Sequence, residues 1–428
     1  MNTGSSIAPS RTLDEWLAYI ERQHPKSIAL GLERVREVAA RLQLARPASQ
    51  VITVAGTNGK GSTVAFIESI ARAAGWKVGA YTSPHLLAYN ERVRIDGVDA
   101  TDDALVAAFE SVEAARGDTA LTYFEYGTLA ALWLFQRTGL DLAVLEVGLG
   151  GRLDAVNLVD ADVAVITTVD LDHQDWLGND REAIGREKAG IARAGRPLVL
   201  GEDDPPSSVL GHAYAIGASA IRAGCDFFFS PTEAGHWQWR EVGAGLELPS
   251  PRLAAPSQLR NAATAIAALR ALPDTLPTDA YAQGVADTDL PGRLQRFNRI
   301  GVEVVVDVAH NPQAARELHA WLQQAPASGR TWAVFAALGD KDIAGIVAAV
   351  GEEVDGWFVA GLDDAGPRGL DADAFVRRLA GSAAEAGEKF ASVGAALAAA
   401  LGGARTGDRV LVFGSFHTVA AALRVLQA

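Results

Sequence analysis

Cysteine is almost absent from this 428-residue sequence, in which Cys225 is the only one. A single cysteine excludes an intramolecular disulfide and a cysteine-based metal cluster. Basic charge is also scarce, because 38 lysines and arginines face 52 aspartates and glutamates, which gives a formal net charge of −14. This balance argues against a nucleic-acid-binding surface as the main function, although local cations could still hold small anionic substrates.

Long apolar runs are absent as well, and no segment approaches the length of a membrane span. Residues 1–11 are polar and lack the apolar stretch of a signal peptide. With 49% hydrophobic and 21% charged residues, the composition is that of an ordinary globular protein. We therefore expect a cytoplasmic protein without membrane or nucleic-acid partners, long enough for two α/β domains.

The sequence does contain a glycine-rich segment between a predicted strand and a predicted helix, residues 51–63 (VITVAGTNGKGST). Its β-branched start predicts a buried strand, and apolar periodicity predicts a helix over 62–74. Glycines between them permit positive φ angles and let backbone N–H groups approach an anion. Lys60 would contact β- and γ-phosphates, and Ser62 or Thr63 a bound Mg²⁺. The spacing differs from the usual GxxxxGK followed by Ser or Thr, and the alternative is a glycine turn with a surface lysine.

Strands and helices are predicted to alternate on both sides of residues 289–293, a proline- and glycine-marked segment that we interpret as a hinge. Before the hinge, the predicted strands are 77–82, 141–147, 162–169 and 197–200, and the predicted helices are 102–116, 122–137, 181–194 and 258–272. After it, the predicted strands are 302–308, 332–338, 356–360 and 409–413, and the predicted helices are 312–323, 371–380, 393–400 and 415–426. This alternation indicates an α/β fold with parallel sheets.

Two domains follow from this pattern, a larger one at residues 1–294 and a smaller one at 295–428. Residues 11–43 look helical, with a break at Pro25. Residues 226–250 have a different residue pattern, with short aromatic and apolar runs. This pattern predicts short antiparallel strands that form a small sheet appended to the larger domain.

Polar residues follow four predicted strands of the larger domain. In chain order they are Lys60, Ser83, Glu146 and the group Asp170, Asp172 and His173. Open parallel sheets bind ligands at the carboxyl ends of their strands, so these side chains are predicted to share one edge. A hydroxyl, a carboxylate and an imidazole beside a triphosphate suit Mg²⁺, and the histidine would also suit Mn²⁺. Each has a plain alternative: a turn before Pro84, an ion pair of Glu146 with Arg152, and a surface histidine.

Lys188 lies in the helical segment REAIGREKAGIAR, where spacing alone favours an exposed, charged helix face. In the smaller domain, the segment DVAHNP puts Asp307, His310 and Asn311 at a strand end. The alternative there is ordinary helix capping by Asn311, with Pro312 in the first turn. The later segment FGSFH likewise lies between a predicted strand and a predicted helix. Two domains with such edges predict a cleft that closes on nucleotide and substrate.

Ten segments together resemble one family. They are AGTNGKGS, TSPHL, ERVRIDG, TYFEYGTLAALWLF, EVGLGGRLDAVN, LDHQDWLG, IGREKAGI, NAATAIAAL, LPGRLQ and DVAHNP, and the matches run from about residue 12 to the C-terminus. The combination is similar to the dihydrofolate synthase/folylpolyglutamate synthase branch of the Mur ligase superfamily. The resemblance implies a Mur-ligase-like fold, with a P-loop ATPase domain of parallel-sheet type and a smaller Rossmann-like C-terminal domain.

The resemblance further implies a ligase that uses ATP to join L-glutamate to 7,8-dihydropteroate, forming dihydrofolate, and to reduced folates, forming folylpolyglutamates. The reaction would pass through an acyl phosphate and release ADP and phosphate. It implies two Mg²⁺ sites, with Mn²⁺ as a substitute and K⁺ as a further allowed cation, and a monomer. The alternatives are another Mur-type amino-acid ligase, or a nucleotide-dependent switch that hydrolyses ATP to move a partner.

Site residues are implied by the matching motifs. ATP would contact Thr57, Asn58, Gly59, Lys60, Gly61, Ser62, Asn261, Arg293 and Asp307. Metal ligands would be Ser62, Ser83, Glu146 and His173. The pterin pocket would comprise Ser27, Ile28, Ala29, Leu30, Thr122, Tyr123, Phe124, Glu125, Leu153, Asp154 and Ala155. Catalysis would use Lys60, His173 and Lys188, the last as N6-carboxylysine, and His310 and Ser415 would face glutamate. One departure is Ala29, where an aspartate is expected in relatives, which leaves the preference for dihydropteroate open.

Overall fold

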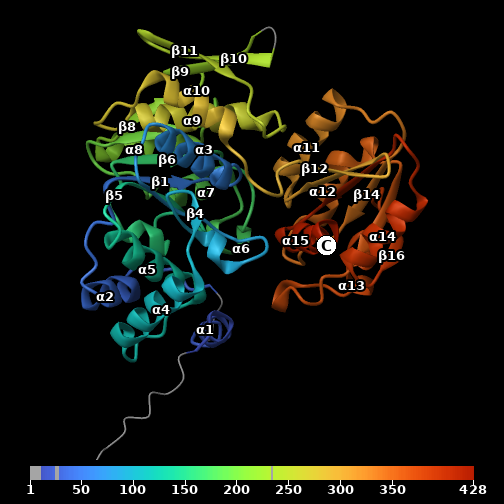
Figure 1. Cartoon of the computed structure of the whole chain (residues 1–428), viewed down its shortest axis with the longest axis horizontal. Helices are drawn as coiled ribbons and strands as arrows, with labels where there is room; N and C mark the ends of the chain where they lie inside the picture. The colour runs from blue at the N-terminus through green and yellow to red at the C-terminus, as the bar shows by residue number, and fades with distance from the viewer. Residues whose placement is uncertain (1–10, 25–27, 233–234) are drawn as a thin grey trace, which may run out of the picture.

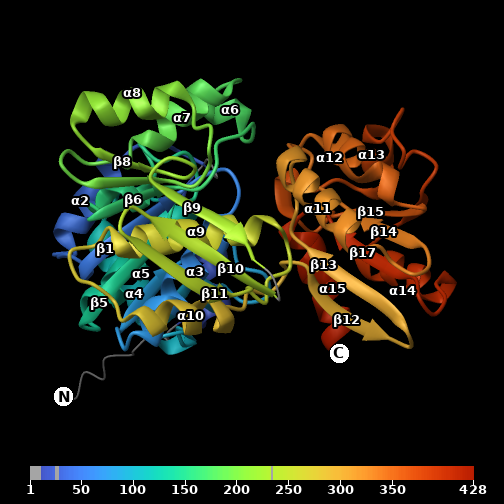
Figure 2. The same cartoon turned by 90° about the horizontal axis from the view of Figure 1, so that it is seen from above.

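The computed structural model describes residues 11–24, 28–232 and 235–428, which form two α/β bodies joined by residues 288–294 (Figure 1). The larger body, blue to yellow, holds an eight-stranded sheet and a three-stranded sheet, and the smaller, orange to red, holds a six-stranded sheet. Figure 2 shows the two bodies side by side from above. Within the described ranges, no helix is both long enough and apolar enough to cross a bilayer.

The large sheet has the strand order β4-β3-β2-β5-β1-β6-β7-β8. Its strands are β1 (Ala48–Ala55), β2 (Val78–Tyr81), β3 (Val93–Ile95), β4 (Val98–Asp99), β5 (Leu140–Glu146), β6 (Val163–Ile166), β7 (Pro197–Leu200) and β8 (Ser219–Arg222). The strands from β2 to β8 along this order pair in parallel, whereas β3 and β4 are antiparallel at one edge. All but one residue of β1 is buried, as expected for a strand covered on both faces.

Helices cover both faces of this sheet. On one face, α3 (Lys60–Ala73), α9 (Ser257–Arg270) and α10 (Thr278–Asp287) pack with Ile52 and Val54 of β1. The other face, with Val51 and Ala55, is covered by α1 (Leu13–Ile20), α2 (Glu33–Arg41), α4 (Asp102–Arg116), α5 (Tyr123–Gln136), α7 (Arg181–Ala189) and α8 (Ser207–Ile216). Because successive side chains of a strand point to opposite faces, β1 contributes to both cores.

The three-stranded sheet comprises β9 (Phe227–Pro231), β10 (His236–Glu241) and β11 (Ala244–Pro249), all antiparallel. Trp239 anchors it to the larger body, since its Nε1 donates to the Ala263 carbonyl of α9 at 3.1 Å. Within the sheet, its ring stacks on Phe227 of β9. The antiparallel strands expected in this region are confirmed.

The smaller body has the strand order β12-β13-β17-β14-β15-β16. The strands are β12 (Gln295–Arg299), β13 (Val302–Asp307), β14 (Thr331–Phe335), β15 (Gly356–Ala360), β16 (Glu388–Phe390) and β17 (Arg409–Phe413). One face is covered by α11 (Pro312–Gln324), α12 (Ile343–Val350) and α13 (Ala372–Arg378), and the other by α14 (Val393–Gly403) and α15 (Phe416–Gln427). Only β12 is antiparallel, so the predicted second α/β series is confirmed.

Candidate active site

The phosphate loop, residues 56–59, joins the end of β1 to the N-terminus of α3. Gly56 and Gly59 have φ angles of +152° and +84°, which side chains disfavour. A Cβ atom added at Gly56 would lie 1.8 Å from Thr167 Oγ1, and one at Gly59 would lie 2.5 Å from Asn261 Oδ1. Both glycines are therefore required by backbone conformation and by space. The loop opens into a 14-residue helix, whose N-terminus favours an anion.

Lys60 begins α3 and folds back over the phosphate loop. Its Nζ donates to the carbonyls of Gly56 at 3.0 Å and Thr57 at 3.1 Å. Burial lowers the pKa of Lys60, while the nearby carboxylates Glu146 and Asp172 oppose that shift. The Lys60 ammonium is therefore held against the carbonyls of its own loop.

Glu146 ends β5, which pairs directly with β1, and Ser83 follows β2, the next strand beyond β5. The Ser83 N–H donates to Glu146 Oε2 at 3.1 Å. A Cβ atom added at Gly61 would lie 3.7 Å from both Glu146 Oε2 and Arg293 Nη2, so both groups face the first turn of α3. Burial raises the pKa of Glu146, and Lys60 opposes the shift. The ion pair with Arg152 is not formed, since Arg152 pairs with Glu187 at 2.9 Å.

The loop after β6 leads into the short helix α6 (Gln174–Leu177) and brings Asp172 and His173 to the same edge. Asp172 Oδ1 lies 2.6 Å from Lys341 Nζ, and Asp172 Oδ2 lies 3.6 Å from His310 Nε2. Burial by itself would raise the pKa of Asp172, but His310 and Lys341 hold it well below its usual range. Burial and the Lys341 charge lower the pKa of His173 to about 4, which keeps its imidazole neutral and able to bind a metal at neutral pH.

Lys188 is buried in α7, with 3% of its surface exposed, so the exposed-face interpretation from spacing is wrong. Burial lowers the pKa of Lys188 to about 7. The Lys60 charge acts in the same direction, whereas Asp172 and Asp154 oppose the shift. The side chain is thus within electrostatic reach of the phosphate-loop lysine and of the Asp172 carboxylate.

Of the three other residues expected at the nucleotide, Asn261 and Arg293 face the start of α3, and Asp307 lies on the smaller body next to Arg293. Asn261 of α9 faces Gly59, as its contact distance shows. Arg293, in the segment between the bodies, lies 5.3 Å from the Phe416 ring centroid. Asp307 ends β13 and accepts the N–H groups of Leu294 and Ala309 at 2.9 and 2.8 Å. Burial raises the pKa of Asp307, while the Arg293 charge lowers it.

An aromatic wall stands where the pterin pocket is expected. The Phe124 ring covers Gly148 so closely that a Cβ atom there would lie 2.6 Å from it. The Tyr81 ring centroid lies 6.0 Å from that of Phe124, and Arg92 lies over the Tyr123 ring at 5.5 Å. Thr122 and Glu125 form a capping box at the start of α5, which fixes the orientation of these aromatic residues.

The remaining residues expected at the pterin line the same region. Arg34 Nη2 donates to the Ala29 carbonyl at 2.9 Å and pairs with Glu125 Oε1 at 2.8 Å. The Leu153 carbonyl accepts the Gly31 N–H at 3.2 Å, which joins the chain beside Ile28 and Leu30 to the loop after β5. Asp154 and Ala155 in that loop are buried. Burial raises the pKa of Asp154 to about 7, although the backbone N–H groups that donate to its carboxylate act to lower that pKa. Ser27 lies outside the described residues.

The two residues expected at glutamate differ in their surroundings. His310 contacts Asp172 across the bodies, and its Nδ1 bonds the Val308 carbonyl at 2.9 Å. Ser415 is buried and caps α15, where its hydroxyl pairs with Thr418. Capping therefore occupies the Ser415 hydroxyl, and a contact with glutamate stays a prediction for both residues.

The expected common edge is confirmed, because β2, β5, β1 and β6 are neighbours in the sheet and their carboxyl ends lie together. The ligand roles of the residues at that edge remain predictions. Sequence reasoning missed Lys341, whose only signal is a lysine between two aspartates (GDKD) after a buried strand. It also missed Gln313, one residue beyond the segment DVAHNP.

A divalent cation would need ligands from outside the protein at this edge. Among the described residues, no three His, Cys, Asp or Glu side chains gather so as to hold a metal by themselves. The Glu146 carboxylate faces the first turn of α3, and the neutral imidazole of His173 lies within electrostatic reach of Lys60, whereas the Asp172 carboxylate is already paired with Lys341. Such a sparse set fits a cation whose remaining ligands are phosphate oxygens and water.

Comparison with known proteins gives consistent matches over nearly the whole chain. The Mur ligase middle domain matches residues 54–228, and the Mur ligase glutamate ligase domain matches residues 292–416. The dihydrofolate synthase/folylpolyglutamate synthase of Escherichia coli K12 is 50% identical over 417 residues, 97% of this chain and 96% of its own.

Solved structures agree. The E. coli FolC in complex with DHPP and ADP superposes with a TM-score of 0.92 at 49% identity and covers 98% of each chain. A bifunctional folylpolyglutamate synthase/dihydrofolate synthase with Mn, AMPPNP and L-glutamate bound has a TM-score of 0.90 at 47% identity, over 98% of this chain and 99% of its own. Together with the strand-end edge described above, these matches establish that the chain belongs to the dihydrofolate synthase/folylpolyglutamate synthase family of Mur ligases, enzymes that form C–N bonds.

Proposed function

We propose that the chain joins L-glutamate to 7,8-dihydropteroate and to reduced folates at the expense of ATP. The observation that carries this proposal is the convergence of Lys60, Glu146, Arg293 and His173 at one edge of the large sheet, facing the smaller body. Relatives crystallised with DHPP and ADP, and with Mn, AMPPNP and L-glutamate, support the ligand classes. We expect the monomer implied by the resemblance, which sedimentation would check.

ATP would occupy the phosphate loop. The N–H groups at the start of α3 and the Lys60 ammonium face the β- and γ-phosphates in this proposal, and Asn261, Arg293 and Asp307 flank the nucleotide. Ser62, Ser83, Glu146 and His173 are the proposed metal ligands, in two sites. A bound Mg²⁺ or Mn²⁺ would neutralise charge on the phosphate oxygens. K⁺ is retained as a further candidate cation.

Chemistry would begin at the carboxylate of the folate precursor. A carboxylate resists attack by an amine because it is anionic and its oxide is a poor leaving group. Transfer of the γ-phosphoryl group gives an acyl phosphate, and Lys60 and Arg293 stabilise the negative charge that spreads over the transferred oxygens. The neutral amine of glutamate then attacks the carbonyl carbon, the new C–N bond forms, and inorganic phosphate leaves. Contact between the two bodies keeps water from the acyl phosphate.

The pterin would bind against the aromatic wall. Phe124 and Tyr123 offer ring faces for stacking, and Asp154 offers a buried carboxyl group for the polar edge of the pterin. The Ala29 carbonyl is held by Arg34, which orders that chain although the expected aspartate is missing.

Lys188 is proposed to react with CO₂ and become N6-carboxylysine. The nitrogen lone pair attacks the carbon of CO₂, one N–H proton passes to solvent, and a carbamate anion results. The reaction needs a neutral amine, and burial supplies it by lowering the pKa of Lys188 to about 7. The carbamate would then orient the metal and the γ-phosphate.

Phosphate release tests the proposed reaction. The purified chain receives ATP, Mg²⁺ and L-glutamate, with dihydropteroate or a reduced folate added in turn. We expect phosphate release only when both glutamate and a pterin-bearing carboxylate are present, with the glutamylated product seen by mass spectrometry. Phosphate release independent of both would support a nucleotide switch instead. Turnover only with a cell-wall nucleotide precursor would support another Mur-type ligase.

A further inference from the structure

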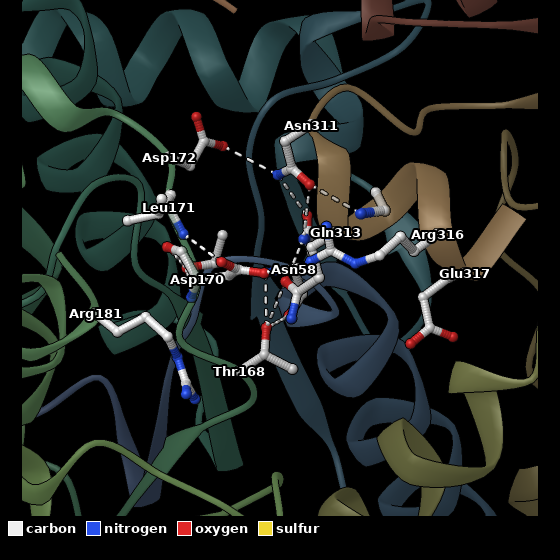
Figure 3. A network of polar contacts seen from close by, with 12 residues as sticks. Asn58, Thr168, Asp170, Leu171, Asp172, Arg181, Asn311, Gln313, Arg316 and Glu317 are labelled. Carbon is white, nitrogen blue, oxygen red and sulfur yellow. Dashed lines mark hydrogen bonds and ion pairs between the residues drawn. The ribbon is translucent and has the colours of Figure 1, made fainter. Parts of the chain in front are cut away.

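The two bodies meet at the phosphate loop through five polar side chains, which we call the clasp: Asn58, Thr168, Asp172, Asn311 and Gln313 (Figure 3). The first three belong to the larger body, and the last two begin α11 of the smaller body. Asn58 Nδ2 donates to Asn311 Oδ1 at 3.0 Å and to Gln313 Oε1 at 2.5 Å. Asn311 Nδ2 donates back to Asn58 Oδ1 at 3.0 Å and also to Asp172 Oδ2 at 3.2 Å.

Every polar group of Asn58 already has a protein partner in this arrangement. Its side chain offers two N–H donors, and both are used within the clasp, as is its carbonyl oxygen. Its backbone N–H donates to Thr168 Oγ1 at 3.1 Å, and its backbone carbonyl accepts from Thr167 Oγ1 at 2.6 Å. The backbone is therefore bound to the end of β6, and the side chain is bound to the smaller body.

The clasp shares its loops with the reaction site. Lys60 follows Asn58 by two residues, and His173 follows Asp172 directly. Asn311 is buried, and its Oδ1 also caps α11 by accepting the Ala314 N–H at 2.9 Å. The predicted capping role is thus confirmed, and the same oxygen accepts the Asn58 amide. The start of α11 is consequently positioned relative to the phosphate loop by hydrogen bonds with a defined direction.

We propose that Asn58 is a positioning residue: its amide pairs with Asn311 and Gln313 and holds the smaller body against the phosphate loop, instead of contacting ATP. The inference rests on the proposed ligase function, in which glutamate and the acyl phosphate must meet between the bodies. Loosening the clasp misaligns these reactants, because small displacements of reacting groups are costly. Nucleotide affinity, which depends on the loop backbone and Lys60, is kept.

Three variants separate this role from a nucleotide contact. Asn58→Ala removes the amide but keeps the backbone bonds to β6. Gln313→Ala removes a partner without touching the phosphate loop. The matched control is Arg316→Ala, because Arg316 also crosses the interface to Asp170 at 2.9 Å but has 59% of its side chain exposed, and exposed ion pairs contribute little.

The expected result is a split between turnover and binding. For Asn58→Ala and Gln313→Ala we expect kcat to fall about tenfold or more, with AMPPNP affinity changed by less than about threefold, as for loss of aligned hydrogen bonds. Arg316→Ala should stay within about twofold of the parent. AMPPNP affinity that falls in step with kcat in Asn58→Ala would overturn the proposal, as would equal effects of Gln313→Ala and Arg316→Ala.

A distance measurement tests the clasp without any turnover. Cys225 is the only cysteine and is exposed on the larger body, so it accepts one label. The second label goes on Gly402→Cys in α14, where an added Cβ meets no atom within 4 Å. We expect the label-to-label distance distribution with AMPPNP to broaden in Asn58→Ala but not in Arg316→Ala. An unchanged distribution would sink the proposal. If the parent chain lacks ligase turnover, the proposed function fails. The distance distributions would still show whether Asn58 holds the two bodies together.

Discussion

Lys188 shows what burial does to the chemistry of one side chain. A solvated lysine has a pKa of about 10.4 and is almost entirely charged at neutral pH. In α7 only 3% of Lys188 is exposed, and burial brings its pKa to about 7. About half of the amines then carry a free lone pair at pH 7. The environment therefore favours capture of CO₂, which a solvated lysine would achieve far less often.

Turnover should depend on CO₂ and on pH through this residue. As the pH falls through about 7, Lys188 becomes protonated in the folded chain and loses the lone pair, so activity should decline and bicarbonate should restore it only above that range. Lys188→Ala should lose about 100-fold in kcat or more, as for removal of a group that stabilises the transition state. Initial rates in CO₂-depleted and bicarbonate-supplemented buffer give the measurement, with the half-exposed Lys389→Ala as control. Full activity of Lys188→Ala would contradict the carbamate role.

At the scale of one element, α3 offers a matched pair of glycines. Gly59 precedes the helix and Gly75 follows it, and both have φ +84°. Alanine at either position costs about 1–2 kcal/mol of backbone strain. Only at Gly59 would the new Cβ also collide, 2.5 Å from Asn261 Oδ1, because Gly75 has no atom within 4 Å.

Gly59→Ala should therefore lose AMPPNP affinity and activity together, while Gly75→Ala should lower only stability, by about 1–2 kcal/mol. Urea unfolding and AMPPNP titration of both variants give the comparison. Equal nucleotide affinities in the two variants would show that the phosphate loop tolerates the collision, against its proposed function.

Sequence patterns predicted the elements that have a strong period. The strand at 51–54, the glycine loop and the helix after it match β1 and α3 closely, because β-branched runs and the 3.6-residue period are local signals. The patterns missed α8, α10, α12, β8, β12 and β16. The short edge strands β8 and β16 bury few side chains, so their sequences lack the alternation of apolar and polar residues that would predict a strand. The helix α12 (IAGIVAAV) is apolar all round, which hides its period.

The site was predictable where it lies on strand ends and unpredictable where it depends on the second body. Lys60, Ser83, Glu146 and His173 follow neighbouring parallel strands, and strand order alone brings them to one edge. Lys341 reaches Asp172 from the other body at 2.6 Å, a contact that depends on how the two bodies dock. No local pattern encodes docking. The burial of Lys188 depends instead on how α7 packs within the larger body, which the charged residues around it do not reveal.

At the scale of the whole molecule, each body has its own apolar cores. The two cores of the larger body lie on the faces of its sheet, and the two of the smaller body lie on the faces of its own sheet. Between the bodies, the clasp, the Lys341–Asp172 pair and the Arg316–Asp170 pair are polar, and Leu86 and Ala255 of the larger body add apolar contacts with the cores of the smaller one. Polar interfaces couple domains weakly compared with shared apolar cores. Ligands that touch both bodies can therefore contribute much of the coupling.

Calorimetry should reveal this arrangement. Without ligands we expect two unfolding transitions, one for each body, because each core can melt without exposing the other. AMPPNP with Mg²⁺ should raise the free energy of unfolding of the larger body by about 2.7 kcal/mol when the ligand is at a hundred times its Kd. The melting temperature of that body should rise accordingly. Because Arg293 faces the first turn of α3 and Asp307 of the smaller body accepts the N–H of the neighbouring Leu294, a bound nucleotide should also move the second transition toward the first. A single unfolding transition without ligands would mean that the contacts between the bodies are enough to couple them. A ligand-induced shift of only one transition would mean that the nucleotide binds to one body only.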